Sequence, residues 1–137
     1  MAAWEESRLI CPGCSAKIER IQEPLCKKCG KPLDDEKREL CTDCKKKKHE
    51  FEQGKAVFVY SGGIRESLYR FKYSNRREYA DFYGEEALRR YEKWIFNKKI
   101  QVIIPIPLHK KRQRGRGYNQ AELFAWVIGA RLGIPVC

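Results

Sequence analysis

Three cysteine pairs constrain the fold of this chain more than any other feature. They are Cys-x-x-Cys pairs that follow one another at a fixed offset of fifteen residues, and their members are Cys11, Cys14, Cys26, Cys29, Cys41 and Cys44. A two-residue spacer lets both sulfurs of a pair face one point, and two such pairs complete a tetrahedral four-sulfur site. Thiolates in this regular arrangement favour zinc over an iron–sulfur cluster. We therefore predict a closed, structural zinc site.

Six thiols do not divide into sites of four, so two assignments are open. We favour a site closed by the second and third pairs, because these pairs can sit on opposite arms of a short hairpin. That assignment leaves Cys11 and Cys14 without partners from this chain, or competing for the same ion. The rival assignment joins the first pair to the second, and spacing alone does not separate the two. Gly30, directly after Cys29, suits a knuckle in which backbone amides approach the sulfurs closely.

The surroundings of the cysteines argue against disulfides. The N-terminus, from Met1 to Glu6, has neither the basic nor the apolar region of a secretory signal. No apolar run approaches the roughly 18 residues of a membrane span, so we expect a cytoplasmic chain with reduced thiols and no membrane span. Cys137 is expected to be a small buried apolar residue. We assign no catalytic residue, because a four-cysteine site has no open coordination position and the lone His109 is interpreted as a packing or hydrogen-bonding residue.

The 137 residues divide into two predicted domains, a zinc ribbon in 1–55 and a partial second domain in 56–137. The first domain holds all six paired cysteines but few large apolar side chains, so zinc binding would replace a hydrophobic core there. The whole chain is 42% hydrophobic and 12% aromatic, a composition that excludes a disordered protein.

Residues 56–137 alternate between strand and helix patterns. The predicted elements are, in order, a strand at 56–60, helices at 64–73 and 79–95, a strand from 102 to about 104, a helix at 120–132 and the start of a strand at 134–137. Asn119 is the expected N-cap of the last helix, and Gly133 with Pro135 ends it. The continuous apolar run Val102–Leu108 is typical of a buried parallel strand. This order predicts an α/β domain with a parallel sheet.

Positive charge gathers in the second domain. Of the chain's 29 Lys and Arg residues, sixteen lie in 56–137 against seven acidic residues, a surplus of nine. No acid lies between Lys93 and Ala121, and such a field favours phosphate-bearing partners. Within this stretch a basic, glycine-bearing loop is expected between the strand and the last helix, where open α/β sheets bind ligands. Among its charged residues, Arg112, Arg114 and Arg116 are candidate phosphate-binding residues.

The segment from Ile104 to Ala121 reads Ile-Pro-Ile-Pro-Leu-His-Lys-Lys-Arg-Gln-Arg-Gly-Arg-Gly-Tyr-Asn-Gln-Ala, and it resembles the ComF family of competence-associated, phosphoribosyltransferase-like proteins. The upstream cysteine knuckles and the segment Ser67–Tyr73 agree with this resemblance. It implies an N-terminal double zinc ribbon, a type I phosphoribosyltransferase fold and a role in handling DNA during natural competence. It also implies that Arg112, Arg116 and Asn119 belong to a pyrophosphate-contacting loop.

Two departures from the family pattern shape the functional expectation. The family's phosphoribosyl-pyrophosphate loop, two acids followed by Thr-Thr-Gly, does not occur in this chain, whose single threonine is Thr42. Members commonly carry a further Cys-x-x-Cys pair upstream, and its absence would explain the unpartnered first pair. We therefore expect a chain truncated at its C-terminus and without phosphoribosyltransferase catalysis of its own. Magnesium with phosphoribosyl pyrophosphate would bind only to the full-length domain.

The alternative prediction is a zinc-ribbon module that binds nucleic acid through the basic surface. Candidate partners are single-stranded DNA and competence helicase or other DNA-processing proteins. The sequence does not indicate an oligomeric state.

Overall fold

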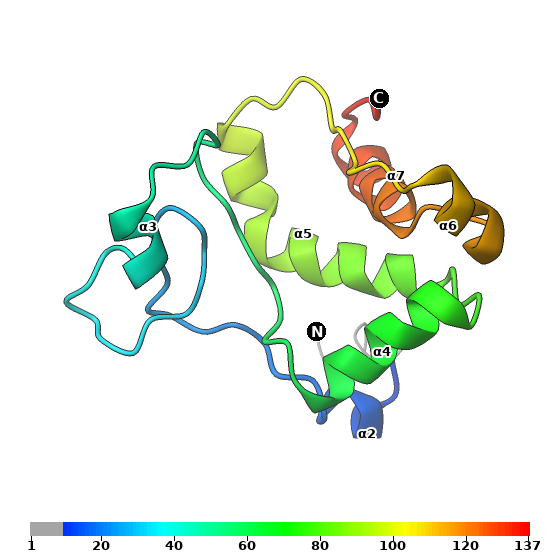
Figure 1. Ribbon diagram of the computed structural model, residues 1–137, viewed down its shortest axis with the longest axis horizontal. Coiled ribbons are helices and arrows are strands. Elements are labelled where there is room, and N and C mark those ends of the chain that lie inside the picture. The colour runs from blue at the N-terminus through cyan, green and yellow to red at the C-terminus, as the bar shows by residue number, and fades with distance from the viewer. Residues whose placement is uncertain (1–9) are drawn as a thin grey trace.

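The computed structural model describes residues 10–137, apart from the side chains of Gln113 and Arg116. Within this part of the chain the helices are α2 (Pro12–Ser15), α3 (Thr42–Lys46), α4 (Gly62–Tyr73), α5 (Tyr79–Asn97), α6 (Lys110–Arg116) and α7 (Gln120–Leu132). Figure 1 shows α5 in the middle of the molecule, with α4, α6 and α7 beside one end and the loops around α3 beside the other. None of these helices is both long and apolar enough to cross a membrane.

The three longer helices lie where apolar spacing predicts them. Between α4 and α5 the chain turns at Asn75, which adopts a positive φ of 55°. At the start of α7, the Asn119 side chain accepts a hydrogen bond of 3.1 Å from the amide of Ala121, as an N-cap does. Gly133 ends α7 in the left-handed conformation, which costs glycine no steric penalty. The predicted caps of this helix are confirmed.

Two apolar clusters hold the helices together. Packing of α5 against α7 buries Ala87, Leu88 and Ile128. Gly84 on α5 allows this approach, because a β-carbon at that position would collide with Val127 on α7. A larger cluster lies where α4, α5 and the start of α7 meet the N-terminal segment, and its buried members are Ile18, Ile64, Phe71, Ala80, Phe82, Tyr83 and Tyr118. The aromatic residues of the second half therefore serve mainly as core.

The segment predicted as the first strand pairs with the N-terminal part of the chain. Phe58 forms an isolated antiparallel bridge with Arg20, flanked by hydrogen bonds of 2.8 Å from the Val59 amide to the Glu19 carbonyl and 2.9 Å from the Ile21 amide to the Val57 carbonyl. Its partner is thus the linker between the first two cysteine pairs rather than a parallel strand.

The predicted parallel pairing is reduced to one bridge. Ile103 pairs in parallel with Val136, and hydrogen bonds of 2.9 Å join the Ile103 amide to the Pro135 carbonyl and the Cys137 amide to the Ile103 carbonyl. The predicted burial of this strand is wrong, since Val102 is 44% exposed and Ile104 is 71% exposed. Ile106, beyond the predicted end of the strand, is 79% exposed. Cys137 is also exposed rather than buried. Within residues 10–137 no sheet forms beyond isolated bridges, so a parallel sheet stays a prediction.

The basic segment expected as a loop is helical. Residues Lys110–Arg116 form α6, directly before the turn at Gly117, whose φ is 79°. The two glycines of this segment suggested a loop, but only Gly117 adopts a conformation that excludes a helix. Arg77 stabilises the turn, because its guanidinium donates to the Gly117 carbonyl at 3.2 Å and lies over the Tyr118 ring.

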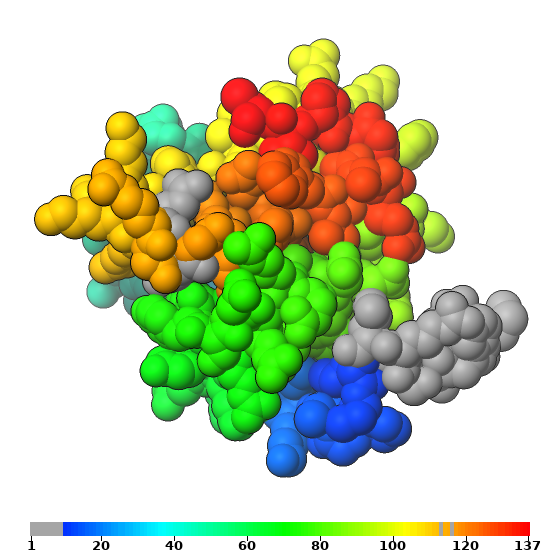
Figure 2. All heavy atoms as spheres, turned by 90° about the vertical axis from the view of Figure 1, so that its right-hand side faces the viewer, coloured from blue at the N-terminus to red at the C-terminus, as the bar shows by residue number. Residues whose placement is uncertain are grey.

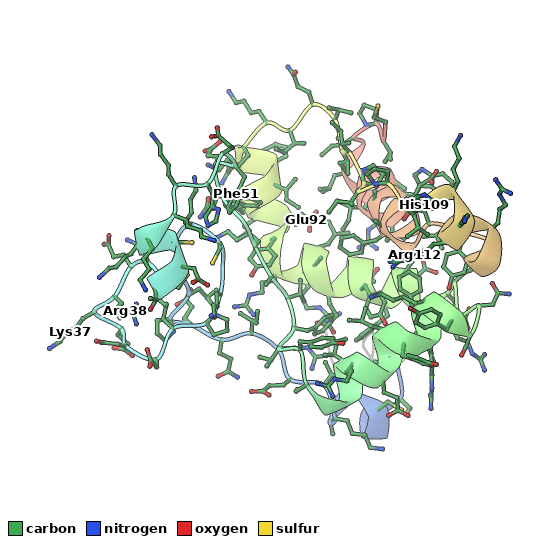
Figure 3. The ribbon with its side chains drawn as sticks, viewed as in Figure 1. Lys37, Arg38, Phe51, Glu92, His109 and Arg112 are labelled. Carbon is green, nitrogen blue, oxygen red and sulfur yellow. The ribbon has the colours of Figure 1, made fainter. Side chains whose placement is uncertain are left out.

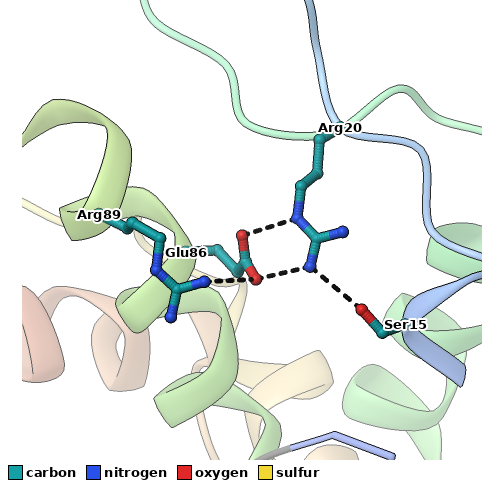
Figure 4. A network of polar contacts seen from close by, with 4 residues as sticks. All are labelled: Ser15, Arg20, Glu86 and Arg89. Carbon is teal, nitrogen blue, oxygen red and sulfur yellow. Dashed lines mark hydrogen bonds and ion pairs between the residues drawn. The ribbon is translucent and has the colours of Figure 1, made fainter. Parts of the chain in front are cut away.

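A partly buried ion pair connects the N-terminal segment to α5. The guanidinium of Arg20 donates to both carboxylate oxygens of Glu86, at 2.9 and 2.7 Å, and to the Ser15 hydroxyl at 3.4 Å. Arg89 lies 3.6 Å from the same carboxylate, as Figure 4 shows. Glu86 is 5% exposed, so its charge depends on these arginines for compensation. This contact, which sequence reasoning missed, holds the two halves of the chain together.

Residues that follow the third cysteine pair also join the first half of the chain to α5. Trp94 donates to the Gln53 side chain at 3.2 Å, and Lys98 pairs with Glu52 at 2.7 Å. The Tyr91 hydroxyl donates to the carbonyl of Ala56. These contacts lie on both sides of the predicted domain boundary at residue 55, and that boundary stays a prediction.

Candidate metal centre

Cys26 and Cys29 lie in a tight turn that faces a single point. Leu25 and Pro32 form an antiparallel bridge, and the Cys26 amide donates to the Lys31 carbonyl at 2.8 Å. Inside this turn Gly30 has a φ of 80°, and a β-carbon on it would lie 2.9 Å from the carbonyl oxygen of Gly54. The turn thus requires glycine for two reasons, its conformation and the close approach of another backbone segment.

The third pair faces the same point from the other side. Cys41 directly precedes α3 and Cys44 lies within it. The backbone amide of Cys41 donates to Cys26 Sγ at 3.3 Å, so the two knuckles are in direct contact. Figure 3 shows yellow sulfur atoms between α3 and the neighbouring loop.

The four sulfur atoms of these two pairs form one compact cluster. The ligand atoms of Cys26, Cys29, Cys41 and Cys44 all lie within 4.8 Å of one another, and Cys29 Sγ is 3.7 Å from Cys41 Sγ. A tetrahedral zinc ion with Zn–S bonds of about 2.3 Å places its sulfurs about 3.8 Å apart. The donor set and its spacing therefore fit a zinc ion, with these four thiolates as the candidate ligands.

Electrostatics within the cluster also favour a cation. Burial raises the pKa of Cys26, but hydrogen bonds from the amides of Cys29, Cys41 and Lys28 outweigh it and lower that pKa to about 6. Burial, followed by the hydrogen bonds of the neighbouring thiols, raises the pKa of Cys44 to about 12. Without a metal, backbone amides stabilise the thiolate of Cys26, whereas burial and the neighbouring thiols disfavour a second thiolate at Cys44. A divalent cation removes this conflict by compensating the charge of all four.

Cys11 and Cys14 do not join the cluster. Over residues 10–137, the group of metal-binding side chains that the geometry brings together contains only the other four cysteines. Cys11 and Cys14 are both exposed, and α2, which begins after Cys11, lies well away from α3 in Figure 1. The geometry thus agrees with the favoured assignment of the second and third pairs and not with the rival one.

The predicted phosphate-binding residues have different environments. Arg112 lines a cavity of about 440 Å³ between α4 and α6, and Arg114 is exposed on α6. The side chain of Arg116 lies outside the described part of the structure. Asn119 is buried and donates to the Ile106 carbonyl at 3.2 Å while its oxygen caps α7, so both ends of its amide are engaged in holding the chain. A role for these four residues in binding phosphate stays a prediction.

The remaining walls of this cavity come from residues that sequence reasoning missed. They are Lys72, Tyr73, Asn75 and Gly115, and Figure 2 shows the face on which α4 and α6 lie side by side. The positive charge of Lys72 was visible in the sequence, but the approach of α4 to α6 was not. His109, directly before α6, is exposed, and its Nδ1 accepts a hydrogen bond of 3.2 Å from the Lys111 amide. It therefore acts as a hydrogen-bonding residue, as predicted.

The family comparison agrees with a zinc-ribbon assignment. A family model described as "Double zinc ribbon domain" matches residues 2–45. Together, this match and the four-cysteine cluster support a structural zinc site. No solved structure matches the chain significantly.

Similar proteins cover more of the chain. The competence protein ComFC of Bacillus subtilis is 30% identical over 122 residues, 85% of this chain and 50% of that protein. Competence protein F of Haemophilus influenzae is 29% identical over 134 residues, 92% of this chain and 55% of that protein. ComFC of Streptococcus pneumoniae is 30% identical over 122 residues, 82% of this chain and 49% of that protein. The chain thus spans about half the length of these curated relatives. The predicted resemblance is confirmed: over most of its own length, this chain is a relative of the ComF family of competence proteins.

Proposed function

We propose that this chain serves in the handling of DNA during natural competence. In this role it is a scaffold that is stabilised by a structural zinc ion and related to phosphoribosyltransferases. The observation that carries this proposal is its similarity, over more than four fifths of its length, to proteins named for competence. In this proposal the metal is structural, because four thiolates occupy every position of a tetrahedral zinc ion. The proposal includes a cytoplasmic location and contacts with competence helicase or other DNA-processing proteins.

We expect that this chain on its own does not act as a phosphoribosyltransferase. The acid-acid-Thr-Thr-Gly type of substrate loop does not occur in its sequence, and the chain spans about half of each relative. We expect no binding of phosphoribosyl pyrophosphate with magnesium. In a thermal unfolding experiment, saturating ligand and magnesium should leave the melting temperature unchanged, because only a ligand that binds the folded state raises it. A clear ligand-dependent rise would contradict this part of the proposal.

A second candidate function is the binding of single-stranded nucleic acid. The observation that favours it is the cavity between α4 and α6, whose charged lining residues are Lys72 and Arg112. Tyr73 also lines it and is 60% exposed, next to Tyr69, which is 62% exposed; their ring centroids are 4.9 Å apart. Cations that contact phosphates beside exposed aromatic rings are the usual elements of single-strand binding.

The test is a filter-binding titration of a single-stranded DNA at several salt concentrations. We expect binding near physiological salt, and a double substitution of Lys72 and Arg112 by Ala should weaken it at least tenfold and make its salt dependence shallower. The matched control replaces Lys45 and Lys47, two exposed lysines of the basic run near α3, and removes the same charge. No detectable binding, or an equal loss in both double variants, would remove this candidate.

A further inference from the structure

An exposed aromatic surface follows α4. Tyr60, directly before the N-cap of this helix, is 67% exposed, Tyr69 is 62% exposed and Tyr73 is 60% exposed. The buried side chains of α4 are those of Ile64 and Phe71 instead. Figure 2 shows α4 at the surface of the molecule, beside α6. The rings of the three tyrosines are therefore open to solvent rather than enclosed in the core.

Helical spacing places this surface along one side of α4. Arg65, Tyr69 and Tyr73 follow one another at four-residue intervals, so neighbouring β-carbons lie about 5–6 Å apart. At the start of this row, the guanidinium of Arg65 lies over the Tyr60 ring, 5.3 Å from its centroid. We call Tyr60, Arg65, Tyr69 and Tyr73 the α4 stripe.

The α4 stripe offers two stacking surfaces. The ring centroids of Tyr69 and Tyr73 are 4.9 Å apart, with 48° between the ring planes. A base inserted between two rings needs about 7 Å, twice the stacking distance of about 3.4 Å, so these two rings form one surface and do not enclose a base between them. Arg65 and Tyr60 form the second surface, because guanidinium groups and aromatic rings both stack on bases.

Positive charge lies beside the α4 stripe. Lys72 lines the cavity between α4 and α6 together with Tyr73 and Arg112. The acidic residue of α4 is Glu66, and its charge is compensated because its carboxylate pairs with Arg70 at 2.9 Å. A strand whose bases lie on the tyrosines can therefore place its phosphates beside Lys72 and Arg112.

We propose that the α4 stripe stacks the unpaired bases of a single strand while Lys72 and Arg112 bind its phosphates. The inference rests on the second candidate function proposed above, and it adds the feature that distinguishes a single strand from a duplex. In a duplex the faces of the bases are already stacked on one another, so they cannot lie on the tyrosines. Since every base has a π-face, this binding would not depend on sequence.

The test compares two strands that differ only in their bases. One is a thymidine oligonucleotide of about 20 nucleotides, and the other is an abasic strand with the same number of phosphates. Filter binding near physiological salt gives the affinity of the whole chain, with zinc bound, for each strand. We expect the thymidine strand to bind at least about tenfold more tightly, because each base that stacks on an aromatic ring adds to the affinity.

Substitutions in the α4 stripe separate stacking from charge. Replacing Tyr69 and Tyr73 together by Leu should remove most of the preference for the thymidine strand and leave the affinity for the abasic strand unchanged. Replacing both by Phe should keep the preference, because phenylalanine retains the aromatic ring. The control is Phe96→Leu, which removes a ring that is 78% exposed near the C-terminal end of α5, and it should leave both affinities unchanged.

The outcomes distinguish base stacking from the binding function on which it rests. Equal affinity of the unmodified chain for the two strands would overturn the stacking proposal and leave a surface that binds phosphates alone. A preference for the thymidine strand that survives the double substitution by Leu, or that Phe96→Leu reduces equally, would also overturn it. No detectable binding of either strand would remove the second candidate function and, with it, base stacking on the α4 stripe.

Discussion

Glu86 places a carboxylate on the buried face of α5, where its side chain is 5% exposed. Arg20 satisfies both of its oxygens, and Arg89 lies nearby. If the carboxylate were removed, the guanidinium groups of Arg20 and Arg89 would lose the negative charge that both of them contact. Arg20 and Arg89 are each 34% exposed, so solvent screening would reduce the loss of stability but would not abolish it.

We predict that Glu86→Gln lowers the free energy of unfolding by about 1–3 kcal/mol, measured by urea denaturation. The matched control is Glu85→Gln, one residue earlier on the same helix. Glu85 pairs with Arg131, and both side chains are more exposed than Glu86, so the control should cost less than about 1 kcal/mol. If both variants lost the same free energy of unfolding, burial of Glu86 would contribute nothing to stability.

Helix packing at the scale of elements depends on the contact between α5 and α7. Gly84 on α5 lies directly against the side chain of Val127 on α7, so that a β-carbon on Gly84 would collide with it. Ala87, Leu88 and Ile128 continue the same interface. Because interiors are close-packed, an added methyl group at Gly84 has to displace Val127 or separate the helices.

We predict that Gly84→Ala destabilises the chain by about 1–3 kcal/mol, although alanine has the higher helix propensity. Gly62→Ala is the control, because a β-carbon on Gly62 in the first turn of α4 would meet no atom within 4 Å. It should change stability by no more than about 0.5 kcal/mol. Thermal and urea unfolding of both variants would check this, and a neutral Gly84→Ala would mean that α5 and α7 are packed more loosely than described.

Stability of the whole molecule comes from two sources. Helices α4, α5 and α7 bury two apolar clusters of their own. In the segment from Cys26 to Lys46 the buried residues are Cys26, at 3% exposure, Cys41, at 5%, and Gly30, which has no side chain. A segment with so small a core relies on metal binding for its order.

We predict that a strong zinc chelator unfolds residues 26–46 while the helical part stays folded. Hydrogen exchange should become fast across the ribbon and remain slow in the middle of α5 and α7, with most of the far-ultraviolet helical signal retained. Returning zinc should restore protection, and Cys41→Ser should show the chelated pattern even with zinc present. Loss of protection throughout the chain on chelation would contradict this division.

The three longer helices and the cysteine knuckles could be predicted because their signals are local. Apolar spacing, the N-cap Asn119 and the stop at Gly133 act within one or two turns, and a Cys-x-x-Cys pair is complete in four residues. The helix α6 could not be predicted, because seven residues including Gly115 are too short to be helical on their own. Its stability comes from the surrounding structure.

Pairing and burial, by contrast, depend on residues far apart in the chain. The sequence by itself determined that two Cys-x-x-Cys pairs could close a zinc site and that the basic charge gathers after Lys93. Only the tertiary structure decided that Cys26, Cys29, Cys41 and Cys44 come together and that Cys11 and Cys14 do not. It also decided that Ala56–Tyr60 contacts the N-terminal linker and that Ile104 and Ile106 are exposed. The physical reason is that spacing fixes how two neighbouring side chains point, whereas the meeting of distant segments depends on the packing of the whole chain.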